Sequence, residues 1–94
     1  METIDNLKKT IEIMIEENNL VKNEMADKML MNHLKEMIKR NEANEKVPQI
    51  EEELFAQVNV KSLAFAEKIV GKFDNLGRDE TFLLAIHFEN MLGE

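Results

Sequence analysis

The stretch DETFLLAIHFE, residues 79–89, decides the fold class, because its centre is a run of large apolar residues that requires burial. The run from Phe82 to Ile86 covers nearly every side of a helix, which is typical of a central helix in a helical bundle. Asp79 is predicted to cap this helix, with Glu80 in its first turn, where negative charge suits the helix dipole. His87 follows the run directly, so its polar ring is either satisfied inside the core or put to use.

The rest of the chain also has helical periodicity. Apolar residues recur at helical spacing in four further segments, and this predicts helices over residues 3–17, 21–41, 50–58 and 61–75. Asn18 and Asn19 are predicted to end the first helix, and Gly77 is a predicted left-handed stop after the fourth. NEANEKVPQ, residues 41–49, contains the only proline and is the longest predicted loop. The sequence therefore predicts an all-α, compact five-helix bundle forming a single domain over residues 1–94.

Composition excludes several classes of function. The net charge is −7, with 12 basic residues among 19 acidic ones, so we expect no direct nucleic-acid binding and a preference for a basic protein partner. No stretch approaches the roughly 20 apolar residues of a membrane span, and METIDNLKKT lacks the apolar core of a signal peptide. We therefore expect a cytoplasmic protein that does not enter a membrane. The absence of cysteine excludes disulfides and thiolate metal sites.

The two histidines, His33 and His87, are the candidate functional residues, and each lies in an apolar helical stretch. They can be structural residues of the core. A zinc site is disfavoured because no third ligand and no paired histidine spacing is present, so no metal or other cofactor is predicted. Hydrolysis is disfavoured because no nucleophile motif is present, and we expect no enzyme. Alternatively, a neutral imidazole can accept a phosphoryl group, and Arg40, two turns after His33, could then pair with the added charge.

Two motifs carry a resemblance to a known family. HLKEMIKR, residues 33–40, resembles the first signature of the PRD, the phosphotransferase-system regulation domain, and DETFLLAIHFE is similar to the second. The resemblance implies a five-helix bundle in which His33 and His87 accept phosphate from HPr or from enzyme IIB proteins, which tunes homodimer packing. It also implies that Arg40 is a charge partner of the first site and Glu80 a helix-start or supporting residue. A free-standing PRD of this kind would regulate a sugar operon through a partner protein.

The sequence departs from the PRD pattern in two places. Many PRDs have an aspartate immediately before the first histidine, where this chain has Asn32, and an Asn-Pro helix start where this chain reads VPQIEEEL. Asn32 removes a carboxylate that could orient the ring of His33, although it remains a candidate supporting residue. From the length of 94 residues we also expect no attached effector domain. An alternative hypothesis is therefore a PRD-like protein-interaction module whose histidines are structural and are not phosphorylated.

Overall fold

The computed structural model describes residues 3–21 and 23–91 and contains five α-helices in those ranges. They are α1 (Ile4–Glu17), α2 (Glu24–Ala43), α3 (Glu52–Phe55), α4 (Val60–Val70) and α5 (Arg78–Glu89). The described residues include no β-strand, so the predicted all-α, five-helix fold is confirmed. Across the described ranges, no helix is both long enough and apolar enough to cross a lipid bilayer.

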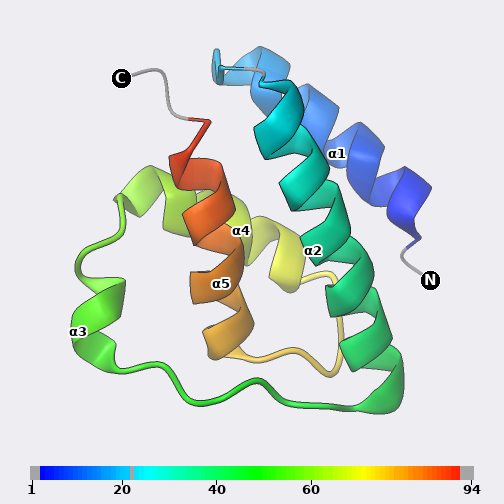
Figure 1. The fold of residues 1–94 in the computed structure, drawn as a ribbon, viewed down its shortest axis with the longest axis vertical. Coiled ribbons are helices and arrows are strands. Elements are labelled where there is room, and N and C mark those ends of the chain that lie inside the picture. Colours follow the sequence, from blue (N-terminus) through cyan, green and yellow to red (C-terminus); the bar gives the residue numbers. More distant parts are fainter. Residues whose placement is uncertain (1–2, 22, 92–94) are drawn as a thin grey trace.

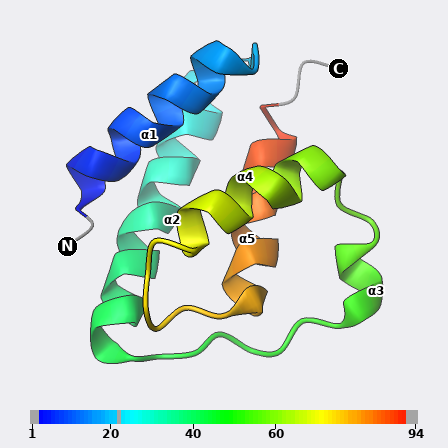
Figure 2. The ribbon, with the colours of Figure 1, turned by 180° about the vertical axis from the view of Figure 1, so that it is seen from behind.

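Helix α5 lies at the centre of the bundle. It runs between α2 on one side and α3 and α4 on the other (Figure 1). Helix α1 crosses α2 at an angle (Figures 1 and 2). The helices meet through apolar stripes at helical spacing, such as Leu7, Ile11 and Met14 on α1, all fully buried. The α5 stripe adds Leu84 and Phe88, which are also fully buried. The core is therefore continuous from α1 to α4, and α5 passes through it.

Asparagine residues form the helix caps on both sides of the connection between α1 and α2. Helix α1 ends where predicted, with Asn18 at its C-terminal cap and Asn19 in the left-handed region at φ 53°. Asn23 then caps α2, because its side-chain oxygen accepts a hydrogen bond from the N–H of Ala26 at 3.1 Å. Between these caps, Val21 N–H donates to the carbonyl of Met91 at 2.7 Å. The α1–α2 connection is thereby tied to the residues that follow α5.

Three of the predicted helices have wrong boundaries. Helix α2 begins at Glu24 rather than residue 21, and α3 covers only Glu52–Phe55 instead of residues 50–58. Helix α4 ends at Val70, five residues before the predicted end, with Gly71 as its C-terminal cap. Glycine has low helix propensity, and the 3₁₀-type bonds that follow, including Phe73 N–H to the carbonyl of Val70 at 3.1 Å, turn the chain away. Partly buried Phe73 thus packs on the core from a turn, outside the helix.

The start of α5 also differs from the prediction. Gly77 is its N-terminal cap in an extended conformation, φ −107°, so it is not a left-handed stop. Asp79 lies inside the first turn and does not cap the helix. Its Oδ1 atom instead accepts a hydrogen bond from the N–H of Ile50 at 2.8 Å. The Asp79 carboxylate therefore bonds to a residue distant in sequence instead of capping its own helix. This contact anchors the long α2–α3 connection to α5.

Candidate functional site

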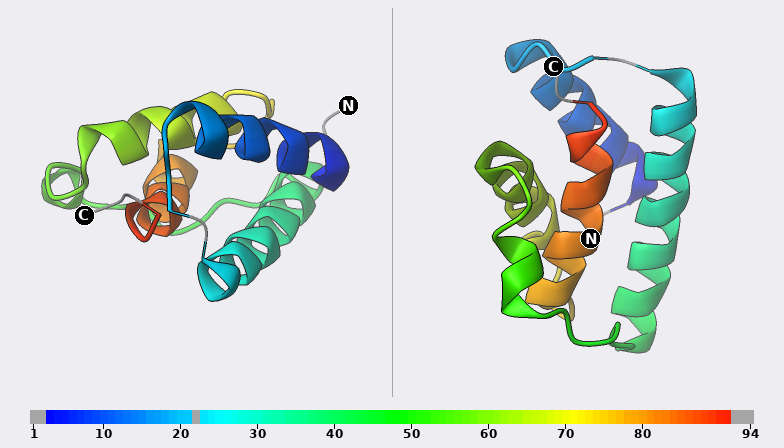
Figure 3. Two further views of the ribbon diagram at one scale, coloured as in Figure 1. Left: turned by 90° about the horizontal axis from the view of Figure 1, so that it is seen from above. Right: turned by 60° about the vertical axis from the view of Figure 1, so that its left-hand side comes forward.

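The two histidines lie side by side on neighbouring helices. Helices α2 and α5 run antiparallel, as the views in Figures 1 and 3 show. The ring centroids of His33 on α2 and His87 on α5 are 4.8 Å apart, and the ring planes are inclined by 37°. Sequence reasoning placed them on different helices without bringing them together. The structure joins them into one site, called here the histidine pair.

A second pair of side chains joins the same two helices. Arg40 Nε donates to Glu80 Oε2 at 2.5 Å and Arg40 Nη2 donates to Glu80 Oε1 at 2.8 Å, which makes a bidentate ion pair. The carboxylate of Glu80 is almost completely buried, at 3% exposed, whereas the Arg40 side chain is 21% exposed. Thus Glu80 is more than a helix-start residue, because it holds the arginine expected to serve His33. Arg40 and Glu80 are called the ion pair below.

The spacing of the sequence explains why both pairs form. Arg40 follows His33 by seven residues, and Glu80 precedes His87 by seven residues. Seven residues are nearly two helical turns, about 10.5 Å, so each helix presents both of its residues on one side. Because the helices are antiparallel, contact between the histidines also brings Arg40 opposite Glu80. This shared step was visible in the sequence, and the Arg40–Glu80 contact could have been predicted from it.

The site favours uncharged imidazoles. The pKa of His33 is lowered from its usual 6.5 to about 4, mainly because burial penalises the charged ring. The positive charges of His87 and Arg40 lower it further, while Glu80 and Glu36 act in the opposite direction. Burial also lowers the pKa of His87. Both rings are therefore neutral near pH 7 and retain a nucleophilic nitrogen lone pair.

The Nε2 atom of His33 is buried and has no hydrogen-bond partner among residues 3–21 and 23–91. A buried polar atom without a partner is costly in a purely structural residue. Asn32, the other candidate supporting residue, is exposed and lines a groove of about 530 Å³ beside α1, together with Thr3 and Lys35. The structure thus brings His33, His87, Arg40 and Glu80 together and places Asn32 in a separate groove.

Three exposed apolar side chains lie close in sequence to the two histidines, two on α2 and one on α5. Met29, one turn before His33 on α2, is 50% exposed, and Met25, one turn earlier, is 72% exposed. Ile86, next to His87 on α5, is 43% exposed. We predicted Met25 and Met29 for the buried face of α2, but its buried residues begin at Leu30. These three exposed side chains are called the apolar patch.

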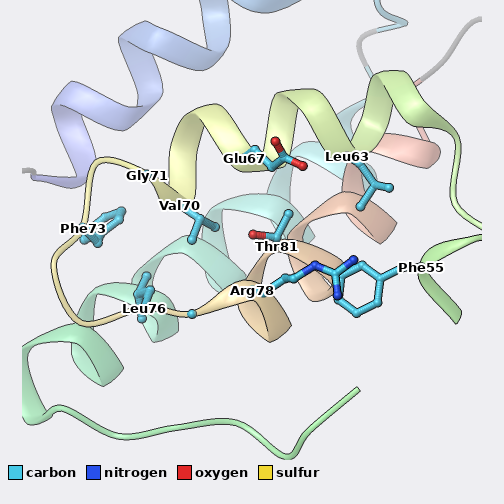
Figure 4. A pocket seen from close by; sticks show the side chains of 10 residues that line it. Phe55, Leu63, Glu67, Val70, Gly71, Phe73, Leu76, Arg78 and Thr81 are labelled. Atoms are coloured by element: carbon cyan, nitrogen blue, oxygen red, sulfur yellow. The ribbon is translucent and has the colours of Figure 1, made fainter. Parts of the chain in front are cut away.

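A separate pocket lies on the other side of α5, between α3 and α4 (Figure 4). Its volume is about 330 Å³, and Phe55, Leu63 and Arg78 are among its lining residues. The Arg78 guanidinium lies 4.0 Å from the centroid of the Phe55 ring and pairs with Glu52. Sequence reasoning missed this pocket because no periodic signal links α3 to the start of α5. Within the described ranges, no cluster of three histidine or acidic side chains can hold a metal ion.

Comparisons with known proteins support the resemblance seen in the sequence. No family model matches the chain, and no curated protein matches it. The structure is similar to that of a PRD-containing transcription regulator from Lactobacillus casei ATCC 334, with a TM-score of 0.83 and 29% sequence identity. The match covers 92% of this chain and 77% of that chain. The fold is PRD-like. This similarity to a PRD-containing regulator supports a regulatory module in general, and a regulatory rather than catalytic protein.

Proposed function

We propose that this chain is a cytoplasmic regulatory module of the bacterial phosphoenolpyruvate sugar phosphotransferase system and is controlled by phosphorylation of His33, His87 or both. The observation that carries the proposal is the histidine pair, whose ring centroids lie 4.8 Å apart at the contact of α2 and α5. Neutral imidazoles beside an arginine are suited to accept a phosphoryl group. The similarity to a PRD-containing transcription regulator supports the same class of function.

The chemistry requires only an acceptor nitrogen in this chain. The lone pair of a ring nitrogen attacks the phosphorus of a phosphorylated donor, such as HPr or an enzyme IIB protein. A new N–P bond forms, the donor's bond to phosphorus breaks, and its electron pair leaves with the donor. The modified ring then carries about two negative charges and three acceptor oxygens. The net charge of −7 on this chain favours a donor that presents a basic surface.

The module is proposed to act through a homodimer formed at the apolar patch. Met25, Met29 and Ile86 expose between 43% and 72% of their surface next to the histidine pair. Exposed large apolar side chains, when they lie together on a surface, are typical of interaction sites. A phosphoryl dianion at their border would have to be desolvated on dimerisation, so phosphorylation would change the dimer equilibrium. Direct nucleic-acid binding forms no part of this proposal.

A second candidate function has the same fold but involves no phosphorylation of the histidines. In this alternative the protein is a PRD-like interaction module with structural histidines. The observation in its favour is the burial of His33 Nε2, since a buried nitrogen cannot meet a donor unless the site opens. The Asn32 departure from the usual aspartate points the same way.

Phosphotransfer can be measured directly. The protein is incubated with phosphoenolpyruvate, enzyme I and HPr, with and without enzyme IIB proteins, and intact mass reports a covalent phosphoryl group. We expect an acid-labile phosphate that is lost in the His33→Ala and His87→Ala double variant. Each single variant assigns the acceptor, and Asn32→Asp tests whether the usual aspartate changes the rate at His33. Absence of label with every donor, from a protein whose circular dichroism shows it folded, would favour the structural alternative.

A further inference from the structure

We propose that phosphorylation of His33 transfers Arg40 from Glu80 to the phosphoryl group and thereby loosens the α2–α3 connection beside the start of α5. This inference rests on the proposed function, because it describes how that modification would change the contacts between helices. In the unmodified protein Arg40 is already engaged, with both of its hydrogen bonds directed to Glu80. Phosphate binding by Arg40 is therefore an exchange of partners.

Arg40 can reach His33. Both residues lie on the same side of α2, nearly two turns apart, and long side chains in a helix point toward its N-terminus, here toward His33. The charge of Arg40 already acts on the ring, since it contributes to the lowered pKa of His33. The Arg40 side chain is also 21% exposed, so it is not fully enclosed by the core.

The exchange favours the phosphoryl group for electrostatic reasons. Glu80 offers one negative charge and two oxygens, whereas phosphohistidine offers about two charges and three oxygens. Both ligands fit the planar fork of arginine in a bidentate manner. Glu80 cannot follow the guanidinium outward without disturbing the helix, because its carboxylate is 3% exposed and sits in the first turn of α5. Arg40 therefore moves and Glu80 remains.

Once Arg40 has left, Glu80 has no cationic partner. A buried carboxylate without a partner is unfavourable, so the contacts at the start of α5 change. Glu80 lines a small cavity of about 30 Å³ together with Lys46 and Asp79. Lys46 Nζ donates to the Asn75 carbonyl at 2.5 Å, and Asp79 accepts from Ile50 N–H at 2.8 Å. Lys46 lies in the α2–α3 connection and is a cation that can take the place of Arg40.

The departure of Arg40 from Glu80 therefore changes a specific contact elsewhere in the structure. When Lys46 turns toward Glu80 it leaves Asn75, and the hold of the α2–α3 connection on the α4–α5 loop weakens. That loop remains tied to α2 through Asn41, whose Oδ1 accepts from Asn75 N–H at 3.0 Å. Residues 44–51 thus become the segment whose contacts report phosphorylation of His33, on the edge of the molecule next to the C-terminal end of α2 (Figure 1).

The experiment observes the exchange in the wild-type protein. The ¹⁵N-labelled chain is phosphorylated either by HPr with enzyme I and phosphoenolpyruvate or chemically by phosphoramidate, and Arg40 Nε–H and Ile50 N–H are followed by NMR. We expect the Arg40 signal to move with phosphorylation and the Ile50 amide to exchange with solvent about tenfold faster, as a local opening predicts. An unmoved Arg40 signal in protein phosphorylated at His33, or a label found on His87 alone, would overturn the inference.

A pair of variants isolates the competition. Glu80→Gln removes the competing charge, so His33 phosphate should persist about fivefold longer against hydrolysis, the scale of a partly exposed ion pair. Glu36→Gln is the matched control, because Glu36 also raises the pKa of His33 but forms no hydrogen bond with Arg40. Equal lifetimes in the two variants would contradict the exchange. If Glu80→Gln does not fold, the wild-type NMR result alone decides.

The two donors separate the failure of this inference from failure of the proposed function. Labelling by phosphoramidate alone, with a shifted Arg40 signal, would reject the phosphotransferase donors and keep the exchange. Labelling by HPr with an unmoved Arg40 signal would keep the function and reject the exchange. A folded protein that neither donor labels would overturn both.

Discussion

The two sides of α5 carry different kinds of side chain. Toward α4 the contact is mainly apolar, with Ala66, Ile69, Leu84 and Ala85 fully buried and Phe88 in edge contact with Phe65 at 5.7 Å between ring centroids. Toward α2 the helix presents the histidine pair and the ion pair, which are polar, titratable and partly open. One helix thus carries a side that stabilises the bundle and a side that can change its charge. The predictions below test how independent those sides are.

The largest effect is expected on the apolar side. Phe88→Ala should lower the free energy of unfolding by about 3–5 kcal/mol, because it removes a fully buried aromatic ring and leaves a cavity. Urea denaturation followed by circular dichroism measures the loss. Ile86→Ala is the control on the same helix, where a side chain that is 43% exposed should cost about 1 kcal/mol or less. Similar costs for the two variants would mean that the α4–α5 contact is not the main stabilising side.

Breaking the ion pair should have the next largest effect. Arg40→Gln should lower the free energy of unfolding by about 2–3 kcal/mol, because it leaves the buried Glu80 carboxylate without its cation. The value lies below that of a fully buried pair because Arg40 is partly exposed. The double variant Arg40→Met and Glu80→Met should recover most of the loss, since no charge then remains buried. A double variant less stable than Arg40→Gln would show that the pair is stabilising in itself.

The histidine side should make stability depend on pH. The folded-state pKa of His33, about 4, lies below the usual 6.5, so the unfolded chain binds the proton more readily. This contribution is complete above about pH 6.5 and declines as the pH falls toward 4, with about 2 kcal/mol lost by pH 5. Urea titrations of the wild type at pH 7 and pH 5 measure the change. His33→Gln, which cannot titrate, should show a smaller change, and an identical change would assign it to other groups.

The smallest effect on folding is expected at the apolar patch. Met29→Lys should change the free energy of unfolding by about 0.5 kcal/mol or less, because the side chain is half exposed, but should shift a dimer toward monomer in sedimentation. His87→Glu, a crude charge mimic of phosphorylation, should shift it in the same direction. Val60→Lys, at an exposed residue on α4, is the control and should leave the sedimentation profile unchanged. A monomeric wild type would remove the dimer from the proposal.

The sequence predicted the fold well because the fold depends on periodicity. Apolar spacing gave the five helices, and paired asparagines gave the end of α1. His33, His87, Arg40 and Glu80 were named as candidates from the sequence, and their role stays a prediction. Their arrangement was not predicted, since periodicity does not say which helices touch. The equal seven-residue steps from His33 to Arg40 and from Glu80 to His87 contain that information once the helices are known to be antiparallel.

Other features could not be predicted because they depend on tertiary partners. Asp79 is a good capping residue by type, yet its carboxylate instead accepts a hydrogen bond from the N–H of Ile50, which is far away in sequence. Met25 and Met29 lie at core spacing, but the first two turns of α2 contribute no buried residue to the bundle. A helical stripe identifies the side of a helix that can be buried, and neighbouring helices decide how much of its length is covered.

The antiparallel contact between α2 and α5 has a consequence for how the site comes into being. Its two halves are far apart in sequence, so neither the histidine pair nor the ion pair can form before α5 has been synthesised. The N-terminal half emerges from the ribosome first, with His33 and Arg40 on a helix that lacks both of its partners. The site therefore forms only when α5 docks, so the proposed phosphorylation would be confined to chains in which α2 and α5 have packed together.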